Sequence, residues 1–321
     1  MRAAVRSRLG SAGDWLRRAL LEADCPLTCV EVRARAIGVV RFRRERRRLR
    51  LEAAASLDLP EGVLRPALAE PNIVDAAAVR QTLAAALDRV GPPPGGRIAL
   101  VLPDLVARLR VFEASEVGGR GSRQTDELIR FRLKRTLPFE IRDAHVSRTS
   151  GVGAGLDRIL VAAAFRPVLA GYEEAIESLG LHAGLVDLAG PALLQVVPEG
   201  PGDRLLVNWD EGYVSFLVAR QGVPLLVRTL SQEAAASAGD VLREAASTAL
   251  YHQERLGSAG LAGAWVRCTV LPPTEAAGLV GDSLGVATAS LDLPTGGASG
   301  APRLVPHELA AGAACVMARA A

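Results

Sequence analysis

Aromatic residues, cysteines and long apolar runs are all scarce in this chain of 321 residues. Aromatics make up only 4%, so a surface that stacks nucleic-acid bases has few side chains to use, and no nucleic-acid partner is expected. Four cysteines are too few for a disulfide framework, and Cys25 and Cys29 lack the second pair that a zinc site requires. No apolar run reaches the roughly 18 residues of a membrane span. With 49% apolar residues and this length, the chain is expected to be a cytosolic protein of two folded domains.

Lysine is almost absent, and Lys134 is the only one among 38 basic residues. Basic charge is nevertheless concentrated at one end. Residues 1–50 hold 14 arginines against five acids, a net +9 in a chain whose formal total is +3. Leucines and valines at helical intervals within residues 1–24 predict a basic amphipathic helix, although Gly10 and Gly13 interrupt it. Three roles stay open for it: contact with an anionic membrane surface, docking on its own domain, or a frayed terminus.

A second basic cluster is predicted at the end of a β-hairpin. The Val-rich alternation of residues 28–42 indicates one strand, and the period-two pattern of Leu49, Leu51 and Ala53 indicates the next. The turn expected between them holds Arg43, Arg44, Arg46, Arg47 and Arg48. Such a cluster favours an anionic membrane surface or an acidic partner, and a solvated hairpin end is the simpler alternative.

The rest of the chain alternates groups of strands with helices. Helices are expected over residues 75–90, 122–137, 167–179, 191–197, 233–256 and 275–284, and again from residue 306. Strands are expected over residues 97–102, 106–113, 144–149, 158–165, 185–188, 204–208, 213–219, 224–230 and 265–271. Residues 106–165 thus form a strand, helix, strand, strand unit. This alternation is typical of the α/β class.

The sequence carries no familiar catalytic signature. The phosphate-binding pattern GxxxxGK[ST] is absent, because the only lysine lies in RLKRTLP with no glycine before it. Gly151, Gly153 and Gly155 lie between two expected strands rather than between a strand and a helix, which predicts a tight turn. GxSxG and HExxH do not occur, and the four histidines are isolated from one another. A conventional hydrolase is therefore poorly supported.

Several segments, in order, carry a family resemblance. The most specific are IALVLPDLVARLRVFEAS from Ile98 and DELIRFRLKRTLPFEI over 126–141, which ends in the pair Pro138 and Phe139. Looser matches are NIVD over 72–75, TALYHQERLG from Thr248 and ELAAGAACVMA from Glu308. Together these segments resemble the PilM family of type IV pilus assembly proteins, which have an actin-like ATPase fold. The resemblance covers about residues 28–321.

The resemblance implies an actin-like, ribonuclease H-like fold of two domains. Domain 1 would comprise residues 28–97 and 167–198, interrupted by an inserted strand-helix-strand-strand subdomain over 98–166. Domain 2 would comprise residues 199–302, and residues 303–321 would return to domain 1 as a C-terminal helix. Residues 1–27 would form a basic extension. Only about twenty residues separate the third strand of the 204–230 meander from Tyr251, so the subdomain that roofs the nucleotide cleft in this family is expected to be reduced or missing.

The positions that resemble the family's nucleotide site depart from its pattern. Actin-like ATPases hold phosphates and magnesium between two hairpins that open with Asp-x-Gly turns. In the first hairpin Glu31 stands at the aspartate and Arg33 at the glycine, so a side chain fills the place where backbone must approach phosphate. The second hairpin has Asn208 at the aspartate and Asp210 at the glycine, followed by Gly212. The adenosine-side glycines are replaced by Pro272 and Pro273.

These departures predict a degenerate, non-catalytic member of the family that binds no cofactor. ATP and magnesium would bind only if the cleft were intact. The alternative is an active ATPase or kinase in which Glu31, Asp203 or Asp210 coordinates magnesium.

The resemblance also implies a function and a partner. The chain would be a cytoplasmic scaffold, peripheral to the inner membrane, that docks the N-terminal cytoplasmic tail of a PilN-like bitopic protein and meets other pilus assembly platform proteins. The tail would lie in a groove beside residues 98–166, with Phe131, Leu137 and Phe139 as candidates for its apolar wall. Packing inside the subdomain is the alternative role for these three side chains. A cytoplasmic component of a type II secretion or competence platform is the alternative function.

Overall fold

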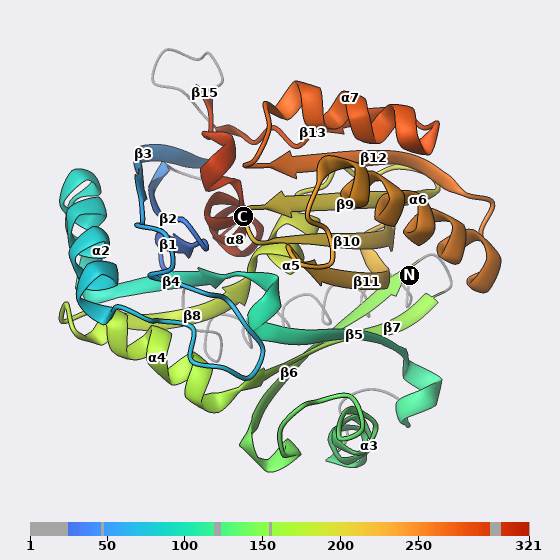
Figure 1. Cartoon of the computed structure of the whole chain (residues 1–321), viewed down its shortest axis with the longest axis horizontal. Coiled ribbons are helices and arrows are strands. Elements are labelled where there is room, and N and C mark those ends of the chain that lie inside the picture. The colour runs from blue at the N-terminus through green and yellow to red at the C-terminus, as the bar shows by residue number, and fades with distance from the viewer. Residues whose placement is uncertain (1–24, 46–47, 119–122, 154–155, 296–302, 321) are drawn as a thin grey trace, which may run out of the picture.

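Two five-stranded sheets, stacked one above the other in Figure 1, form the body of the protein. A computed structural model describes residues 25–45, 48–118, 123–153, 156–295 and 303–320. Within them the strands and helices follow the α/β alternation that the sequence predicts. The two sheets share one plan, in which three antiparallel strands are followed by two parallel ones. Each sheet is the centre of one domain.

The first sheet has the order β3-β2-β1-β4-β8. Its strands are β1 (Thr28–Val32), β2 (Ala36–Glu45), β3 (Arg48–Asp58), β4 (Arg97–Leu102) and β8 (His182–Leu188). The side chains of β1 alternate between the two faces of the sheet. Val30 and Val32 join the apolar cluster of α2 (Ala76–Val90) and α4 (Arg166–Glu177), whereas Cys29 and Glu31 face the opposite side. That opposite side faces the second domain.

The second sheet has the order β11-β10-β9-β12-β13. Its strands are β9 (Asp203–Asp210), β10 (Tyr213–Arg220), β11 (Val223–Ser231), β12 (Leu261–Cys268) and β13 (Thr288–Ser290). The helices α6 (Ala238–Arg255) and α7 (Pro273–Leu284) cover its outer face around Phe216 and Val266. Six residues, 232–237, join β11 to α6, so no roof subdomain is inserted there.

Two short apolar helices lie between the sheets and hold the domains together. These are α5 (Ala189–Leu194) and α8 (Ala310–Ala320), seen at the centre of Figure 1. They share one buried cluster with Ala99 and Val101 of the first sheet and with Leu206 and Leu217 of the second. The hydrophobic core is therefore continuous across the domain boundary, which favours a fixed arrangement of the two domains.

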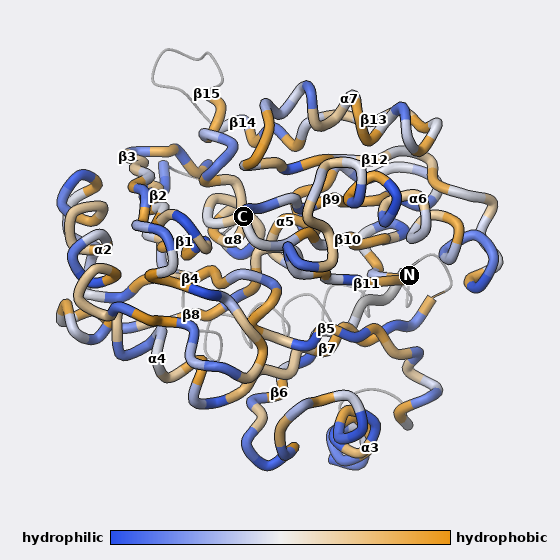
Figure 2. Tube along the Cα trace, in the orientation of Figure 1, coloured by the Kyte–Doolittle hydropathy of each residue, from blue (hydrophilic) through white to orange (hydrophobic). Residues whose placement is uncertain are grey.

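A small three-stranded sheet is inserted between β4 and α4. It has the order β5-β7-β6 and comprises β5 (Ala107–Glu113), β6 (Ala144–Gly153) and β7 (Leu156–Phe165). The helix α3 (Arg123–Leu133) packs Ile129 and Leu133 on Ile159 and Val161 of β7. Its outer residues are mainly hydrophilic, in contrast to the apolar strands β4 and β12 (Figure 2). The inserted subdomain therefore has its own small core and a polar outer surface.

Several sequence-based boundaries are wrong. Residues 28–42 form two strands rather than one, because the chain turns at 33–35, where the Arg33 amide donates to the Ala36 carbonyl. Arg43 and Arg44 consequently lie within β2 and Arg48 within β3, not in a turn. The helix expected to reach residue 137 ends at Leu133, where the Thr136 amide donates to the Leu133 carbonyl in a tight turn.

The helix expected from residue 233 begins at Ala238 instead. Ser237 and Asp240 form a capping box, in which each side chain accepts a hydrogen bond from the backbone amide of the other. This reciprocal cap fixes the first turn at Ser237 and leaves the five preceding residues as a link.

Some sequence-based predictions fall outside the described residues. They are the basic helix within residues 1–24 and the side chains of Arg46 and Arg47. Among the described cysteines, Cys25, Cys29, Cys268 and Cys315 are all free thiols. In the described part of the chain no helix has the length and apolarity needed to cross a membrane.

Gly38 provides a test of how tightly the C-terminal segment packs on the first sheet. It lies on β2 opposite Glu31, and a Cβ atom there would overlap the buried side chain of Leu309. We expect Gly38→Ala to lower the free energy of unfolding by about 1–3 kcal/mol, because the core must shift to accept the methyl group. Urea denaturation measures this change.

Gly171→Ala is the matched control. Gly171 lies within α4, and its Cβ would meet no atom within 4 Å. That variant is expected to gain about 0.5–1 kcal/mol, since alanine is the better helix former. Equal effects of the two substitutions would contradict the packing described here.

Candidate functional site

The two hairpin turns that resemble a nucleotide site face each other between the domains. The first turn, residues 33–35, joins β1 to β2, and the second, residues 211–212, joins β9 to β10. Gly212 has a φ of 93°, and a Cβ atom built on it would lie 3.4 Å from the Cβ of Ala34. The structure thus brings the sequence-predicted residues Glu31, Arg33, Asn208, Asp210 and Gly212 into one region.

Arg267 occupies the space between these hairpins. It lies on β12 and is fully buried. Its Nη2 donates to Glu31 Oε1 at 2.6 Å, and its Nη1 donates to Asp210 Oδ2 at 2.5 Å. Nη1 also lies 3.1 Å from Asn208 Oδ1. Because Glu31 belongs to the first domain and Asp210 to the second, this guanidinium joins both domains through charge-assisted hydrogen bonds. We call Arg267, Glu31, Asp210 and Asn208 the interdomain cluster.

The second oxygen of each carboxylate is also occupied. Glu31 Oε2 accepts a hydrogen bond of 2.7 Å from the Gly312 amide in the first turn of α8. An anion is favoured there, since the first amides of a helix have no partner within the helix. Asp210 Oδ1 accepts from Thr269 Oγ1 and from the Glu211 amide, both at 2.8 Å. No carboxylate oxygen of the interdomain cluster is left without a donor.

Asp104 adds a second link between the domains. It follows β4, is fully buried, and accepts hydrogen bonds from the Gly190 amide at 2.8 Å and from Asn208 Nδ2 at 3.3 Å. Asn208 also donates to the Tyr213 hydroxyl at 3.0 Å. A Cβ atom on Gly190 would lie 2.6 Å from Asp104 Oδ2, so only glycine permits this close approach. Burial raises the pKa of Asp104 to about 6 despite these hydrogen bonds.

Positive and negative charges balance inside the site. Arg33 is buried and donates to Ser56 Oγ at 2.9 Å, while its charge acts on Glu31 and Asp210. Burial alone would raise the pKa of Asp210, but Arg267 and Arg33 outweigh it and lower that pKa. Burial likewise tends to lower the pKa of Arg267, and Asp210 and Glu31 reverse this and raise it. Two guanidinium groups therefore neutralise two buried carboxylates.

These residues do not fit a nucleotide with its magnesium ion. The side chain of Arg33 stands where a phosphate-binding turn needs bare backbone, and both Nη atoms of Arg267 already bind protein oxygens. Among the described residues, no group of three or more His, Cys, Asp or Glu side chains is placed to hold a metal ion. We therefore derive no reaction step through ATP at this site.

Asp203 lies at the opposite end of β9 from Asp210, too far away to share a ligand with it. Its Oδ2 accepts from Ser258 Oγ at 2.6 Å and lies 2.8 Å from His252 Nε2. Arg220 binds both carboxylate oxygens. This cluster ties β9, β10 and α6 together, and Asp203 lies apart from Glu31 and Asp210.

The three side chains expected to line a peptide groove differ in exposure and in packing partners. Phe131, on α3, is 71% exposed. Leu137 packs against the core of the inserted subdomain, and Phe139 stacks on Phe165 with ring centroids 4.7 Å apart. Only Phe131 among the three presents a largely exposed apolar surface, and the groove they were expected to form stays a prediction.

The described part of the arginine hairpin is partly neutralised by its own acid. Glu45 accepts from Arg43 at 2.6 Å and from Arg50 at 3.3 Å. Arg43 and Arg48 are exposed, and Arg44 is exposed as well. Exposed ion pairs of this kind contribute little to stability.

Sequence reasoning missed Arg267, the residue on which the site is centred. Its local sequence, AWVRC, has the apolar pattern of a buried strand. The only available signal was a charged residue inside that pattern, since a buried arginine requires anionic partners.

Arg267→Met tests the interdomain cluster. The substitution leaves Glu31 and Asp210 buried without their cation, so we expect a loss of about 3–5 kcal/mol in unfolding free energy, measured by urea denaturation. Arg148→Met is the control, because Arg148 pairs with the half-exposed Asp126 and its loss should cost about 1 kcal/mol or less. If Arg267→Met does not fold, adding Glu31→Gln and Asp210→Asn should restore folding by removing the unpaired charges. Equal losses for the two single variants would overturn the assignment.

The Asp203 cluster predicts a dependence of stability on acid pH. Burial would raise the pKa of Asp203, but hydrogen bonds from Arg220 and Ser258 outweigh it and lower the pKa from 3.8 to about 2. Because the folded pKa is the lower one, ionised Asp203 stabilises the fold above pH 3.8, and this contribution disappears as pH falls towards about 2. Asp203→Asn should therefore destabilise the protein more at pH 7 than at pH 3 in urea denaturation.

Asp88→Asn, on the exposed face of α2, serves as the control and should change stability little at either pH. If the loss of unfolding free energy in Asp203→Asn were the same at low pH, this carboxylate would act only through packing.

Comparison with known proteins supports the fold. No protein-family model and no curated protein match the sequence. Among solved structures, the chain is similar to the PilM–PilN type IV pilus biogenesis complex, with a TM-score of 0.68 and 17% identity over 93% of this chain and 98% of that one. The cytoplasmic domain of EpsL, an inner-membrane component of the type II secretion system of Vibrio cholerae, gives a TM-score of 0.48 and 13% identity over 76% and 83% of the two chains. A Bacteroides thetaiotaomicron protein with an actin-like ATPase fold and unknown function gives a TM-score of 0.46 and 8% identity over 81% and 88%. The chain therefore has the PilM-like, two-domain actin-like fold that its sequence predicts, with an inserted strand-helix-strand-strand subdomain.

Proposed function

We propose that this chain is an actin-fold scaffold that assembles pilus components at the inner membrane without binding or hydrolysing nucleotide. The observation that carries this proposal is the position of Arg267. Its guanidinium joins the two hairpins that would hold the phosphates and magnesium of an actin-like ATPase, at 2.5–2.6 Å from a carboxylate on each side. The site is thus filled and neutralised by the chain itself.

A permanent cation in the cleft changes how the fold operates. In a nucleotide-dependent protein, a ligand that binds one arrangement of the domains more tightly shifts the population towards it. Here the linking group is covalently part of β12, and the shared core of α5 and α8 reinforces it. The domains are therefore held in one arrangement, which suits a scaffold better than a switch.

The proposed partner is the N-terminal cytoplasmic tail of a PilN-like bitopic membrane protein. The similarity to a PilM–PilN complex motivates this choice. On the inserted subdomain, Phe131 offers an exposed apolar anchor on a helix that also carries Arg130 and Arg132. A tail with an apolar residue near its start can bury against this ring, and aromatic anchors commonly contribute most of the affinity of such contacts.

Peripheral contact with the inner membrane belongs to the same proposal. Arg43, Arg44 and Arg48 are exposed on the β2–β3 hairpin, and each basic residue near an anionic surface contributes about 1 kcal/mol of attraction. Glu45 offsets part of that attraction. The hairpin therefore assists a membrane-bound partner rather than anchoring the protein by itself. A role in a type II secretion or competence platform would use the same scaffold with a different partner.

Calorimetry with two ligands tests the proposal. Titration of the full chain with magnesium ATP should give no heat at millimolar concentration and no melting shift, whereas ligand at 100 times its dissociation constant would add about 2.7 kcal/mol of stability. A synthetic peptide of the N-terminal cytoplasmic tail of a PilN-like protein from the same organism should bind. Micromolar binding of ATP would overturn the nucleotide-independent scaffold.

Two variants separate docking from folding in the peptide titration. Phe131→Ala should lower the affinity for the peptide at least tenfold. The melting temperature should not change, because the ring is 71% exposed. Leu137→Ala should lower the melting temperature, because Leu137 packs against the core of the inserted subdomain. If Phe131→Ala bound the peptide as well as the unchanged protein, the docking surface would lie elsewhere.

A further inference from the structure

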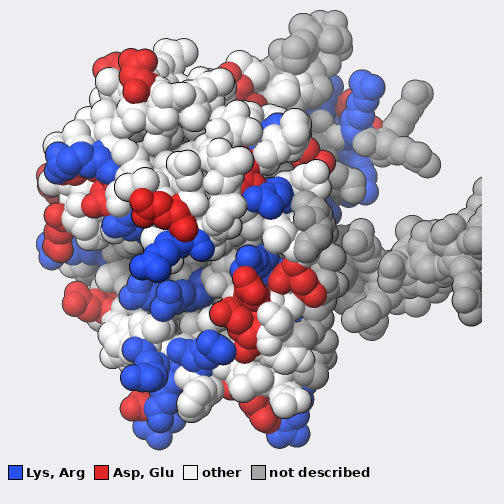
Figure 3. Space-filling view, turned by 90° about the vertical axis from the view of Figure 1, so that its right-hand side faces the viewer, with Lys and Arg blue, Asp and Glu red and all other residues white. Residues whose placement is uncertain are grey.

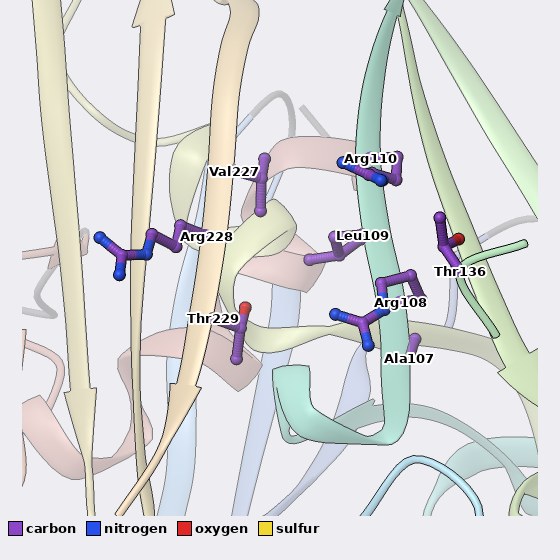
Figure 4. A pocket seen from close by; sticks show the side chains of 8 residues that line it. All are labelled: Ala107, Arg108, Leu109, Arg110, Thr136, Val227, Arg228 and Thr229. Carbon is purple, nitrogen blue, oxygen red and sulfur yellow. The ribbon is translucent and has the colours of Figure 1, made fainter. Parts of the chain in front are cut away.

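A groove separates the inserted subdomain from the second domain, away from both the interdomain cluster and Phe131. Its volume is about 370 Å³, and one wall is residues 107–110 of β5 while the other is residues 227–229 of β11. Both strands are the outermost members of their sheets. Figure 4 shows the two strands on either side of the space, with side chains of both pointing into it. An edge strand has backbone amides and carbonyls without partners, which a further strand can bind.

The β5 wall carries two free positive charges. Arg108 and Arg110 are exposed, and among the described residues neither makes a hydrogen bond or ion pair. In Figure 4 the Arg108 guanidinium extends from β5 towards β11, and the Arg110 side chain lies across β5. The other charges of the two walls are neutralised, because Glu113 pairs with Arg158 at 2.8 Å and Arg228 pairs with Glu244 at 2.6 Å.

The wider surface on that side carries charges of both signs around the two arginines. Figure 3 looks onto the right-hand side of Figure 1 and shows Lys and Arg side chains gathered over the lower part of that face, with acidic side chains beside them. The groove is therefore suited to an anionic ligand.

The residue between the two arginines in the sequence is apolar. Leu109 is buried and points into the groove, and Val227 of β11 points into it from the other side. Leu109 lies on the opposite face of β5 from Arg108 and Arg110, because successive side chains of a strand alternate. Along its edge β5 thus presents a basic, an apolar and a basic side chain in turn, with the apolar one on the opposite face.

We propose that this groove binds an extended acidic segment of a partner protein, which adds as a strand to the free edge of β5. In neighbouring strands, residues directly opposite each other lie on the same face of the sheet. Side chains two residues apart in a strand are about 6.6 Å apart, so Asp or Glu at alternate positions would meet Arg108 and Arg110 together. The residue between them would point towards Leu109 and Val227. The recognised pattern is therefore acid, apolar, acid.

This site goes beyond the tail-docking function proposed above, since it uses a different surface and a different chemistry. A free phosphate would satisfy one arginine but would use neither the backbone edge nor the apolar contact. The strand geometry therefore favours a peptide.

A fluorescent peptide with the core EVEVE between Gly-Ser flanks is the probe, and fluorescence anisotropy with the full chain is the measurement. The peptide should bind, and its affinity should fall as the salt concentration is raised. The isomer VEEEV has the same composition without the alternation and should bind at least tenfold more weakly. The double variant Arg108→Glu, Arg110→Glu should also bind EVEVE at least tenfold more weakly.

Arg80→Glu with Arg89→Glu is the matched control. Both arginines are exposed on α2, and the double change alters the net charge by the same amount. This variant should bind EVEVE as the unchanged protein does. Equal weakening of both double variants would show that only the net charge attracts the peptide, and would overturn the groove.

Methylation of the peptide backbone tests strand addition. Alternate amides of an added strand point towards β5 and away from it, so N-methylation at one set of alternate positions should abolish binding and at the other set should not. Equal tolerance of both sets would overturn strand addition. Failure of EVEVE to bind at all would overturn the proposal and leave Arg108 and Arg110 as guards against edge-to-edge aggregation.

Discussion

The arrangement of this protein depends on one buried guanidinium. Arg267 carries its charge into a region from which water is excluded, and a lone cation there would be severely destabilising. Glu31 and Asp210 make the position tolerable, and each of them in turn needs Arg267. Asp210 and Arg267 belong to the second domain and Glu31 to the first, so the ion pair of Glu31 with Arg267 can form only across the domain boundary. Electrostatic necessity therefore holds the two halves together, whether or not the pair adds net stability relative to apolar side chains.

The surrounding packing is organised to bring these charges into contact. Glycines at 38, 190 and 212 keep side chains away from places where backbone, carboxylate or a second turn must approach closely. The helices α5 and α8 fill the space between the sheets with small apolar residues, which lets the sheets approach. Polar contacts thus set the register of the domains, and apolar contacts supply most of the buried surface. To bind here, a nucleotide would have to displace the polar contacts without disturbing the apolar ones.

Much of the fold could be predicted from the sequence, because its strands and helices have clear periods and a resemblance supplied their order. The resemblance also pointed to Glu31, Arg33, Asn208 and Asp210, which the structure brings together. The resemblance placed a hairpin near Arg33, but the strand pattern alone missed the turn at 33–35, because apolar residues continue on both sides of it. Arg267 was missed for a different reason: its carboxylate partner on β1 is 236 positions away, and no local pattern reports such a distant contact. The sequence also could not show that Phe131 is exposed whereas Leu137 and Phe139 are packed. That difference depends on where α3 ends and on which residues its neighbours contact.

The hydrogen bond from the Gly312 amide to Glu31 joins positions 281 residues apart. During synthesis β1 leaves the ribosome early, whereas β12 and α8 are made near the end of the chain. N-terminal domains usually fold first, while the remainder is still being translated. Here Glu31 lacks its ion-pair partner until β12 has been made, and one apolar face of the first sheet stays uncovered until α8 emerges. The first domain of this protein therefore completes its folding only after nearly the whole chain has been made, and its exposed face depends on protection in the meantime.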